Sequence, residues 1–119
     1  MDIQILDHKI CVEEIKRIAE FWYGTMIKGT VDIEGRRVAI GGDYHIESSE
    51  LLTDTGSNFE DIWGFNIRFE ETPEGDLEFD SMVNIKPNMG NRARNIEDTE
   101  TVKKAREIIY EFIDLKDLK

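Results

Sequence analysis

The feature that most constrains the fold is a pair of alternating segments, residues 62–70 and 77–85, on either side of a short turn. Apolar residues take every second position in the first segment (Trp63, Phe65, Ile67, Phe69) and most alternate positions in the second (Leu77, Phe79, Val83, Ile85). A period of two is typical of a β-strand that buries one face, because successive side chains point to opposite sides. The pair therefore predicts a β-hairpin with one apolar face.

The segment Thr72-Pro73-Glu74-Gly75 between them predicts where the chain turns. Proline at the second position and glycine at the fourth are typical of a type I turn. Pairing Phe69 with Phe79 across this turn sets Arg68 opposite Asp80, a favourable cross-strand charge pair. The same register places three further pairs opposite one another: Trp63 with Ile85, Asn66 with Met82, and Gly64 with Asn84.

A second hairpin is predicted in residues 25–42, TMIKGTVDIEGRRVAIGG. With its turn at Glu34-Gly35, apolar residues face one another on one side of the hairpin and a charge pair forms on the other. The predicted pairs are Val31 with Val38, Asp32 with Arg37, Gly29 with Ile40, and Ile27 with Gly42.

Two segments before residue 60 have the apolar spacing of helices. Residues 11–22 predict an amphipathic helix that ends near Tyr23-Gly24, where glycine suits a helix terminus. Residues 47–56 predict a two-turn helix with Ser48 as its N-cap and Gly56 past its end.

A C-terminal helix, capped by Asp98 or Thr99, has the predicted stripe Val102, Ala105, Ile109, Phe112, Ile113 and Lys116. Near the N-terminus, Ile3 and Ile5 alternate and indicate a short edge strand. The element order is then β-α-β-β-α-β-β-α, in which the first strand either joins the sheet or stays outside it. We expect an α+β fold of one domain, residues 1–119, with an antiparallel sheet from two hairpins packed by two long helices.

The charge balance bears on the partners that the chain can bind. Lys and Arg number 15 and Asp and Glu number 26, which gives a formal net charge of -11. Such a surface repels the phosphates that dominate nucleic-acid affinity, so we expect no nucleic-acid partner. We also expect no membrane association, because the longest apolar run is far shorter than the ~20 residues of a membrane span.

Two further observations favour a cytoplasmic protein. The N-terminal residues lack the basic and apolar regions of a signal peptide. The single cysteine, Cys11, cannot form an internal disulfide, and this is typical of a reducing compartment.

Several segments resemble a known family in the same order along the chain. They are YGTMIKGTVDI (23–33), IGGDYH (40–45), LL and GS (51–52 and 56–57), DIWGFN (61–66) and VNIKPNMGNR (83–92). From Trp22 onward the chain resembles a small prokaryotic family, DUF5674, which is classed as a domain of unknown function. It departs from the family pattern at Asp43, where glutamate is expected, and at Ala93-Arg94. The resemblance implies a free-standing cytosolic domain without an established activity, whose polar motif residues are candidates for a site.

The tetrapeptide DTGS, residues 54–57, resembles the motif of aspartic proteases, in which two carboxylates share a proton and activate water. A chain of this length supplies one copy and would have to act as a symmetric dimer. In those enzymes the motif leaves an apolar strand, whereas here it follows a predicted helix. We therefore interpret it as a helix terminus followed by a turn.

Asp43, His45 and Glu47 stand at alternate positions in the segment GGDYHIE. On one face of a strand, carboxylates and an imidazole can hold a divalent metal, which makes Asp43 and His45 candidate ligands. We favour the structural alternative, in which Asp43 pairs with Lys28 and His45 packs at the turn, and we expect no cofactor. His45 stays the candidate catalytic acid or base near pH 7.

Residues 86–95, KPNMGNRARN, carry three cations and no acid. The predicted hairpin places the start of this loop beside residues 57–61, so one interpretation pairs its arginines with nearby carboxylates. The alternative is an anion site, in which Gly90 permits close backbone approach, Asn91 donates through its amide and Arg92 presents a planar fork.

Two hypotheses of function follow from these candidates. In the first, the domain binds an anionic small molecule through Gly90, Asn91 and Arg92, and His45 serves as acid or base if it is an enzyme. This hypothesis predicts that His45 and Arg92 share one concave pocket.

In the second hypothesis, the domain works through protein contacts, for example as a homodimer. Asn66, Met82 and Asn84 are predicted on the sheet face opposite the core, where they would line either a dimer contact or a shallow ligand site. Asn66 and Asn84 are therefore candidate binding residues in both hypotheses.

Overall fold

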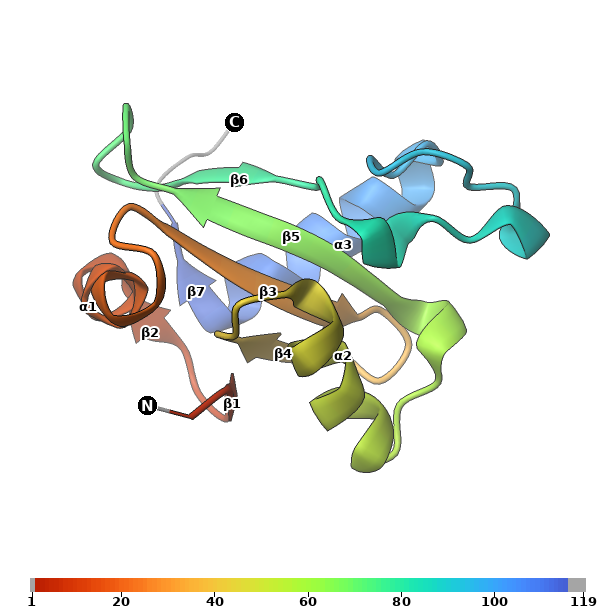
Figure 1. Cartoon of the computed structure of the whole chain (residues 1–119), viewed down its shortest axis with the longest axis horizontal. Coiled ribbons are helices and arrows are strands. Elements are labelled where there is room, and N and C mark those ends of the chain that lie inside the picture. Colours follow the sequence, from red (N-terminus) through yellow and green to blue (C-terminus); the bar gives the residue numbers. More distant parts are fainter. Residues whose placement is uncertain (1, 116–119) are drawn as a thin grey trace.

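A five-stranded sheet with the strand order β1-β4-β3-β5-β6 forms the centre of the molecule, and all of its pairings are antiparallel (Figure 1). The computed structural model describes residues 2–115. The strands are β1 (Gln4–Ile5), β3 (Met26–Asp32), β4 (Arg37–Ile40), β5 (Ile62–Arg68) and β6 (Asp76–Glu78). Both hairpins contribute to this sheet and helices pack on it, so the expected α+β class is confirmed.

The helices α1 (Val12–Trp22) and α3 (Thr99–Phe112) pack on one face of the sheet, and Figure 1 shows α3 behind it. The predicted bounds of α1 and the predicted start of α3 are confirmed. α1 ends before Gly24, which has a φ of +85°, and the Asp98 carboxylate accepts a hydrogen bond from the Thr101 N–H at 3.1 Å at the start of α3. The main core lies between these helices and the sheet, and its fully buried members include Ile15, Ile27, Val31, Phe65, Ile67, Ile108 and Ile109.

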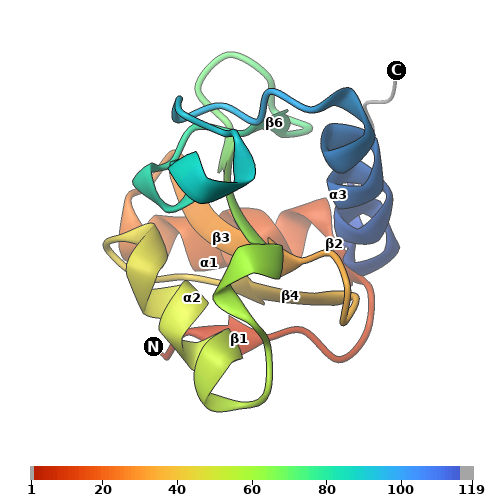
Figure 2. The ribbon, with the colours of Figure 1, turned by 90° about the vertical axis from the view of Figure 1, so that its right-hand side faces the viewer.

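The helix α2 (His45–Asp54) lies on the opposite face, and in the edge-on view of Figure 2 it is left of the sheet while α3 is right of it. The expected N-cap at Ser48 is wrong, because the helix begins three residues earlier. The Glu47 carboxylate instead accepts the backbone N–H groups of Asp43 at 2.6 Å and Tyr44 at 3.1 Å. The DTGS segment lies at the end of α2, where Gly56 has a φ of +117°.

The first hairpin, β3 with β4, has the expected register over most of its length. β4 ends at Ile40, so the outermost expected pair, Ile27 with Gly42, does not form. Ile27 instead lies opposite Ile67, because the two hairpins join directly through β3 and β5. The N-terminal strand β1 pairs with the outer side of β4. The confirmed pairs are Val31 with Val38, Asp32 with Arg37, and Gly29 with Ile40.

The second hairpin, β5 with β6, has a register that differs from the expected one. Arg68 lies opposite Asp76, whereas the sequence register set it opposite Asp80, four positions further along. The turn itself is confirmed, since the Gly75 N–H donates to the Thr72 carbonyl at 2.9 Å. The innermost observed pair, Arg68 with Asp76, encloses residues 69–75, which contain this turn.

The observed register keeps the buried face of both strands, but the expected apolar pairs Phe69 with Phe79 and Trp63 with Ile85 do not form. Ile67 lies opposite Leu77, so both strands still bury the same face. Glu78 now lies opposite Asn66, and its carboxylate accepts from Asn66 Nδ2 at 2.9 Å and from Arg68 Nε at 2.7 Å. Glu78 thus takes the place of Asp80 as the partner of Arg68.

After Glu78 the chain leaves the sheet, and the expected continuation of the strand to residue 85 is wrong. Met82–Asn84 form one turn of 3-10 helix, which Ser81 begins by accepting the Val83 N–H on its Oγ at 3.0 Å. Val83 consequently packs with Leu52 on the α2 side of the sheet and not in the main core. This turn is the structural reason that an open space remains beside α2.

A short parallel pair of strands, β2 (Ile10–Cys11) and β7 (Ile113–Asp114), was not expected. Ile113 was predicted in the C-terminal helix, but it is fully buried in an extended conformation after the helix ends. The predicted stripe residue Lys116 lies outside the described residues. No helix within residues 2–115 is long and apolar enough to cross a membrane.

Candidate functional site

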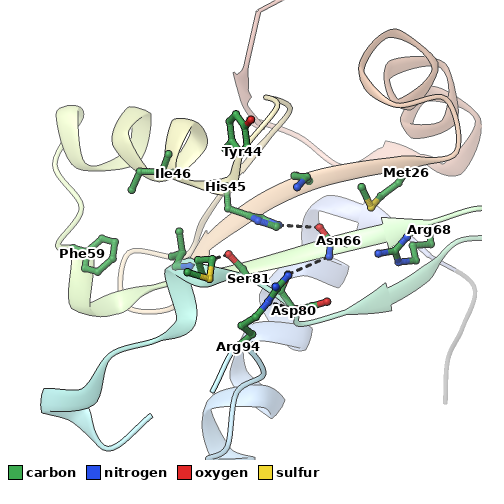
Figure 3. Close-up of a pocket in the computed structure, with 13 residues that line it drawn as sticks. Met26, Tyr44, His45, Ile46, Phe59, Asn66, Arg68, Asp80, Ser81 and Arg94 are labelled. Carbon is green, nitrogen blue, oxygen red and sulfur yellow. Dashed lines mark hydrogen bonds and ion pairs between the residues drawn. The ribbon is translucent and has the colours of Figure 1, made fainter. Parts of the chain in front are cut away.

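A pocket of about 510 Å³ opens on the α2 face of the sheet, and we call it the central pocket (Figure 3). β3 and β5 form its floor, the start of α2 forms one wall, and the segment that follows β6 forms the other. The lining residues are Met26, Lys28, Tyr44, His45, Ile46, Phe59, Asn66, Arg68, Asp80, Ser81, Met82, Val83 and Arg94.

The composition of the floor follows from the alternation of the two central strands. Their odd-numbered residues enter the main core, and even-numbered residues on the opposite face line the pocket, namely Met26, Lys28, Asn66 and Arg68. The register sets Met26 opposite Arg68 and Lys28 opposite Asn66. The alternation of the two strands therefore places two cations and an amide on the pocket face of the sheet.

His45 is positioned by two acceptors on β5, and Figure 3 shows its ring directed at Asn66. Its Nε2 atom lies 2.8 Å from Asn66 Oδ1 and 3.0 Å from the Phe65 carbonyl oxygen. The Asn66 Nδ2 atom donates to Glu78 at 2.9 Å and to the Asp80 carbonyl at 3.2 Å, which fixes the amide with its oxygen toward the imidazole. Two acceptors require the proton on Nε2, so the lone pair of a neutral ring is on Nδ1.

The surroundings of His45 also decide its charge. Burial of the ring lowers the pKa of His45 below its usual 6.5. The hydrogen bond to the Phe65 carbonyl opposes this shift, and the nearby charge of Lys28 adds to it. His45 is therefore neutral at pH 7 and can accept a hydrogen bond or a proton at Nδ1.

Two arginines in the lining are matched by carboxylates. Arg68 Nε donates to Glu78 at 2.7 Å, and this hydrogen bond is the main reason that the pKa of Arg68 is raised. Arg94 Nε donates to Asp80, also at 2.7 Å. A guanidinium has five N–H groups, so each of these side chains keeps further N–H groups that can donate to a ligand.

Lys28 differs from the two arginines, because within residues 2–115 it has no carboxylate at ion-pair distance. The expected pairing of Lys28 with Asp43 is therefore wrong. Its ammonium nitrogen lies 5.4 Å from the ring centroid of Tyr23 and 6.0 Å from that of Tyr44. Such cation–π contacts orient the charge without neutralising it.

Asn84 braces the wall that follows β6. Its Oδ1 accepts the Gly64 N–H at 2.7 Å, and its Nδ2 donates to the carbonyls of Gly64 at 3.1 Å and Arg94 at 2.9 Å. The side chain thus replaces the strand partner that β5 lacks at this position. Glycine is needed there because a Cβ atom on residue 64 would lie 2.5 Å from Ser81 Oγ.

Lys86 anchors the same wall to the segment before β5. It is 3% exposed, and its ammonium donates to the carbonyls of Phe59 at 3.1 Å and Val83 at 3.0 Å. The nitrogen also lies 3.7 Å from the centroid of the Phe59 ring, which lines the pocket. Burial lowers the pKa of Lys86 to about 8. The expectation that this loop starts beside residues 57–61 is confirmed by these contacts.

The predicted binding loop Gly90-Asn91-Arg92 does not contribute to the central pocket. The Asn91 amide donates to three backbone carbonyls between 2.7 and 3.1 Å, and its oxygen accepts the Glu97 N–H at 2.8 Å. These hydrogen bonds engage both the nitrogen and the oxygen of the Asn91 amide, so the side chain stabilises the conformation of the loop. Arg92 is exposed and does not share a pocket with His45.

Gly90 and Asn91 instead line a separate cavity of about 430 Å³ beside the start of α3. Glu97 and Asp98 also line this cavity, which holds no cation among its described residues. Two carboxylates repel an anion, so the surroundings of the loop disfavour the role that its own residues suggested.

The metal hypothesis for Asp43 and His45 depended on a continuing strand, and the structure has a helix there instead. Glu47 is engaged by backbone N–H groups, and Asp43 is exposed at the helix start. Within the described range, no group of three His, Cys, Asp or Glu side chains is placed to hold a metal ion.

Of the residues singled out in the sequence, the structure brings His45, Asn66 and Met82 together in the central pocket. Asn84 lies behind the wall as a brace, fully buried. The sequence indicated Lys28 only as an ion-pair partner of Asp43, and it did not indicate Arg68, Arg94 and Tyr44 as site residues. A signal was present for two of them, because Lys28 and Arg68 occupy the non-core positions of predicted strands.

Comparison with known proteins places the chain in one family. No curated protein and no solved structure matches it significantly. The model of one family, described as a protein of unknown function, matches residues 4–112, which is most of the chain. The chain therefore belongs to the DUF5674 family.

Proposed function

We propose that this protein binds an anionic small molecule in the central pocket. The observation that carries the proposal is the charge of the lining, with three cations and one carboxylate, in a chain of 15 basic and 26 acidic residues. Cations gathered in a cleft attract anions, and low-dielectric walls strengthen the attraction. The volume of about 510 Å³ suits a small ligand, since such sites span roughly 300–1,000 Å³.

Four polar residues of the pocket have a direct role in this proposal. Lys28 supplies an unpaired ammonium, while Arg68 and Arg94 supply the N–H groups that their carboxylate partners leave available. His45 contributes Nδ1, which would act as acid or base if the bound molecule is also transformed. A cytoplasmic location is part of the proposal, because the single Cys11 and the acidic composition are typical of that compartment.

The proposal is tested by a thermal-shift screen of anionic metabolites, with calorimetry on each hit. A ligand that binds the native state raises the midpoint of unfolding, and the rise increases with the logarithm of the ligand concentration once that exceeds the Kd. The variant Lys28→Gln should weaken binding about tenfold or more, as expected for the loss of a hydrogen bond to a charged group. Lys103→Gln makes the same change on an exposed position of α3 and should leave binding unchanged.

A third variant, Arg92→Gln, separates the central pocket from the loop that the sequence suggested. Binding that is lost in Arg92→Gln and kept in Lys28→Gln would move the anion site to the Gly90-Asn91-Arg92 loop. If no anion stabilises the wild type, the proposal is wrong.

A specific observation also favours the second candidate, a protein-interaction domain. Four large apolar side chains around the pocket mouth are exposed: Tyr44, Ile46, Phe59 and Met82. Exposed apolar patches frequently mark contact surfaces. In that case a homodimer would form through this face, and self-association would increase with concentration.

A further inference from the structure

Of the three cations that line the central pocket, two are accompanied by carboxylates. Arg68 is matched by Glu78 and Arg94 by Asp80. A second carboxylate, that of Glu70, lies 3.6 Å from Arg68. Lys28 is the lining cation without such a partner in the described part of the chain. A ligand with one negative charge would therefore find one lining cation, Lys28, free to pair with it.

A dianion would be accommodated less well than a monoanion. A phosphate monoester carries nearly two negative charges at neutral pH, and the second would meet no unpaired cation in the pocket. The rest of the surface would add repulsion, because the chain has a formal net charge of -11. The charge count thus favours a carboxylate over a phosphate.

The apolar side chains at the mouth indicate what else the ligand carries. Tyr44 and Met82 are 67% and 68% exposed, and Ile46 and Phe59 are 45% and 42% exposed. Among the described residues they are four of the seven large apolar side chains with high exposure. Figure 3 shows Tyr44, Ile46 and Phe59 on the α2 side of the pocket, away from the Arg68 end. A small inorganic anion on the floor would leave this surface in water.

The positions of the pocket floor and of the four exposed apolar side chains indicate how the charged and the apolar part of the ligand are arranged. Lys28 projects from β3, directly opposite Asn66 of β5, so a charged head that meets it lies over the sheet. Tyr44 and Ile46 begin α2, and Met82 is in the turn after β6, so they contact the part of a ligand that extends toward the opening. Tyr44 lies next to both regions, because its ring faces the Lys28 ammonium at 6.0 Å.

We infer that the ligand of the central pocket is a monocarboxylate with an apolar body, held by its carboxylate at Lys28 and by its body at the Tyr44, Ile46, Phe59 and Met82 rim. This inference rests on the proposed anion-binding function and narrows it to one chemical class. It also gives the exposed rim a role in ligand binding, in place of a protein contact.

The inference is tested with three matched series of straight-chain compounds on the intact protein: monocarboxylates from acetate to octanoate, the corresponding primary amides, and alkyl phosphates of the same lengths. Calorimetry should show carboxylate affinity rising about fourfold per added CH₂ group until the rim is covered. Lys28→Gln should lower carboxylate affinity about tenfold and leave amide affinity unchanged. Met82→Gln should flatten the dependence on chain length, and Met89→Gln, which changes an exposed methionine outside the pocket, should not.

The possible results separate this inference from the function on which it rests. Alkyl phosphates that bind more tightly than carboxylates of equal length would overturn the carboxylate assignment and leave anion binding intact. Carboxylate affinity that does not depend on chain length would overturn the apolar body. If neither carboxylates nor phosphates bind, both the inference and the proposed function fail.

Discussion

Single amide side chains do much of the positioning in this protein. Asn66 orients His45 with its oxygen and contacts Glu78 with its nitrogen. Asn91 holds three carbonyls and one N–H, and so keeps a loop in shape. An amide offers both donors and acceptors in one plane, as the backbone does, and can therefore replace a missing backbone partner. The same chemistry made these residues resemble ligand contacts in the sequence.

The first prediction concerns the protonation of His45. An NMR titration of the imidazole should give a midpoint below 6.5 and show the Nε2–H tautomer in the neutral ring, because the ring is buried between two acceptors. His8, the other histidine, is assigned with the variant His8→Gln. A midpoint at or above 6.5 would contradict the structure.

The same shift has a consequence for stability. Because the folded pKa of His45 is lowered, the unfolded chain binds more protons between the folded pKa and 6.5. The contribution of His45 to the free energy of unfolding is therefore complete above pH 6.5 and is lost as the pH falls through the folded pKa. Comparison of the wild type with His45→Gln should show this difference in urea unfolding between pH 7.5 and 4.5.

At the scale of the elements, the position of the pocket depends on the point where the chain leaves the sheet, which is the end of β6 (Asp76–Glu78). A strand continued to residue 85 would have extended the sheet beside β5, and residues 80–83 would not have formed a wall of the pocket. The turn begun by Ser81 lifts the chain away, and Asn84 then satisfies the exposed edge of β5 at Gly64. The turn that Ser81 begins therefore accounts both for the wall of the pocket and for the hydrogen bonds of Asn84 that hold this wall to β5.

The second prediction tests this brace. Asn84→Ala should lower the free energy of unfolding by about 2–4 kcal/mol, because it leaves buried backbone groups of Gly64 without partners. Asn88→Ala, at an exposed position of the following loop, should change stability by less than about 0.5 kcal/mol. Urea unfolding measures both. Equal effects of the two variants would show that Asn84 is not a brace.

At the scale of the whole molecule, β3 and β5 are the long inner strands on which the other elements pack. They pair over seven residues each, with α1 and α3 on one face and α2 on the other. Their edge neighbours are shorter, since β1 has two residues and β6 has three. A sheet organised in this way has its highest local stability at its centre.

The third prediction follows from this arrangement. Native-state hydrogen exchange should find the slowest amides in β3 and β5, and faster exchange in β6 and in the loop of residues 69–75, because these have fewer packed neighbours. The measurement is amide exchange followed by NMR or mass spectrometry. Protection in β6 equal to that in β5 would mean that the second hairpin continues beyond Glu78 in solution.

The sequence by itself determined the fold class, the bounds of α1, the start of α3, most of the first hairpin and the face that each central strand buries. These depend on local patterns, namely the period of apolar residues, the caps and the turn residues. It also indicated His45, because an imidazole titrates near pH 7, and Asn66, because strand alternation places it on the sheet face opposite the core.

Only the tertiary structure decided the register of the second hairpin and, with it, the location of the pocket. Alternation fixes which face a residue occupies, but a shift of four positions preserves every face, so the apolar pattern cannot distinguish the two registers. The choice depends on contacts between distant segments, such as Glu78 with Arg68 and Asn84 with Gly64. The cationic lining has the same origin, because Lys28, Arg68 and Arg94 meet only after β3, β5 and the late loop have packed together.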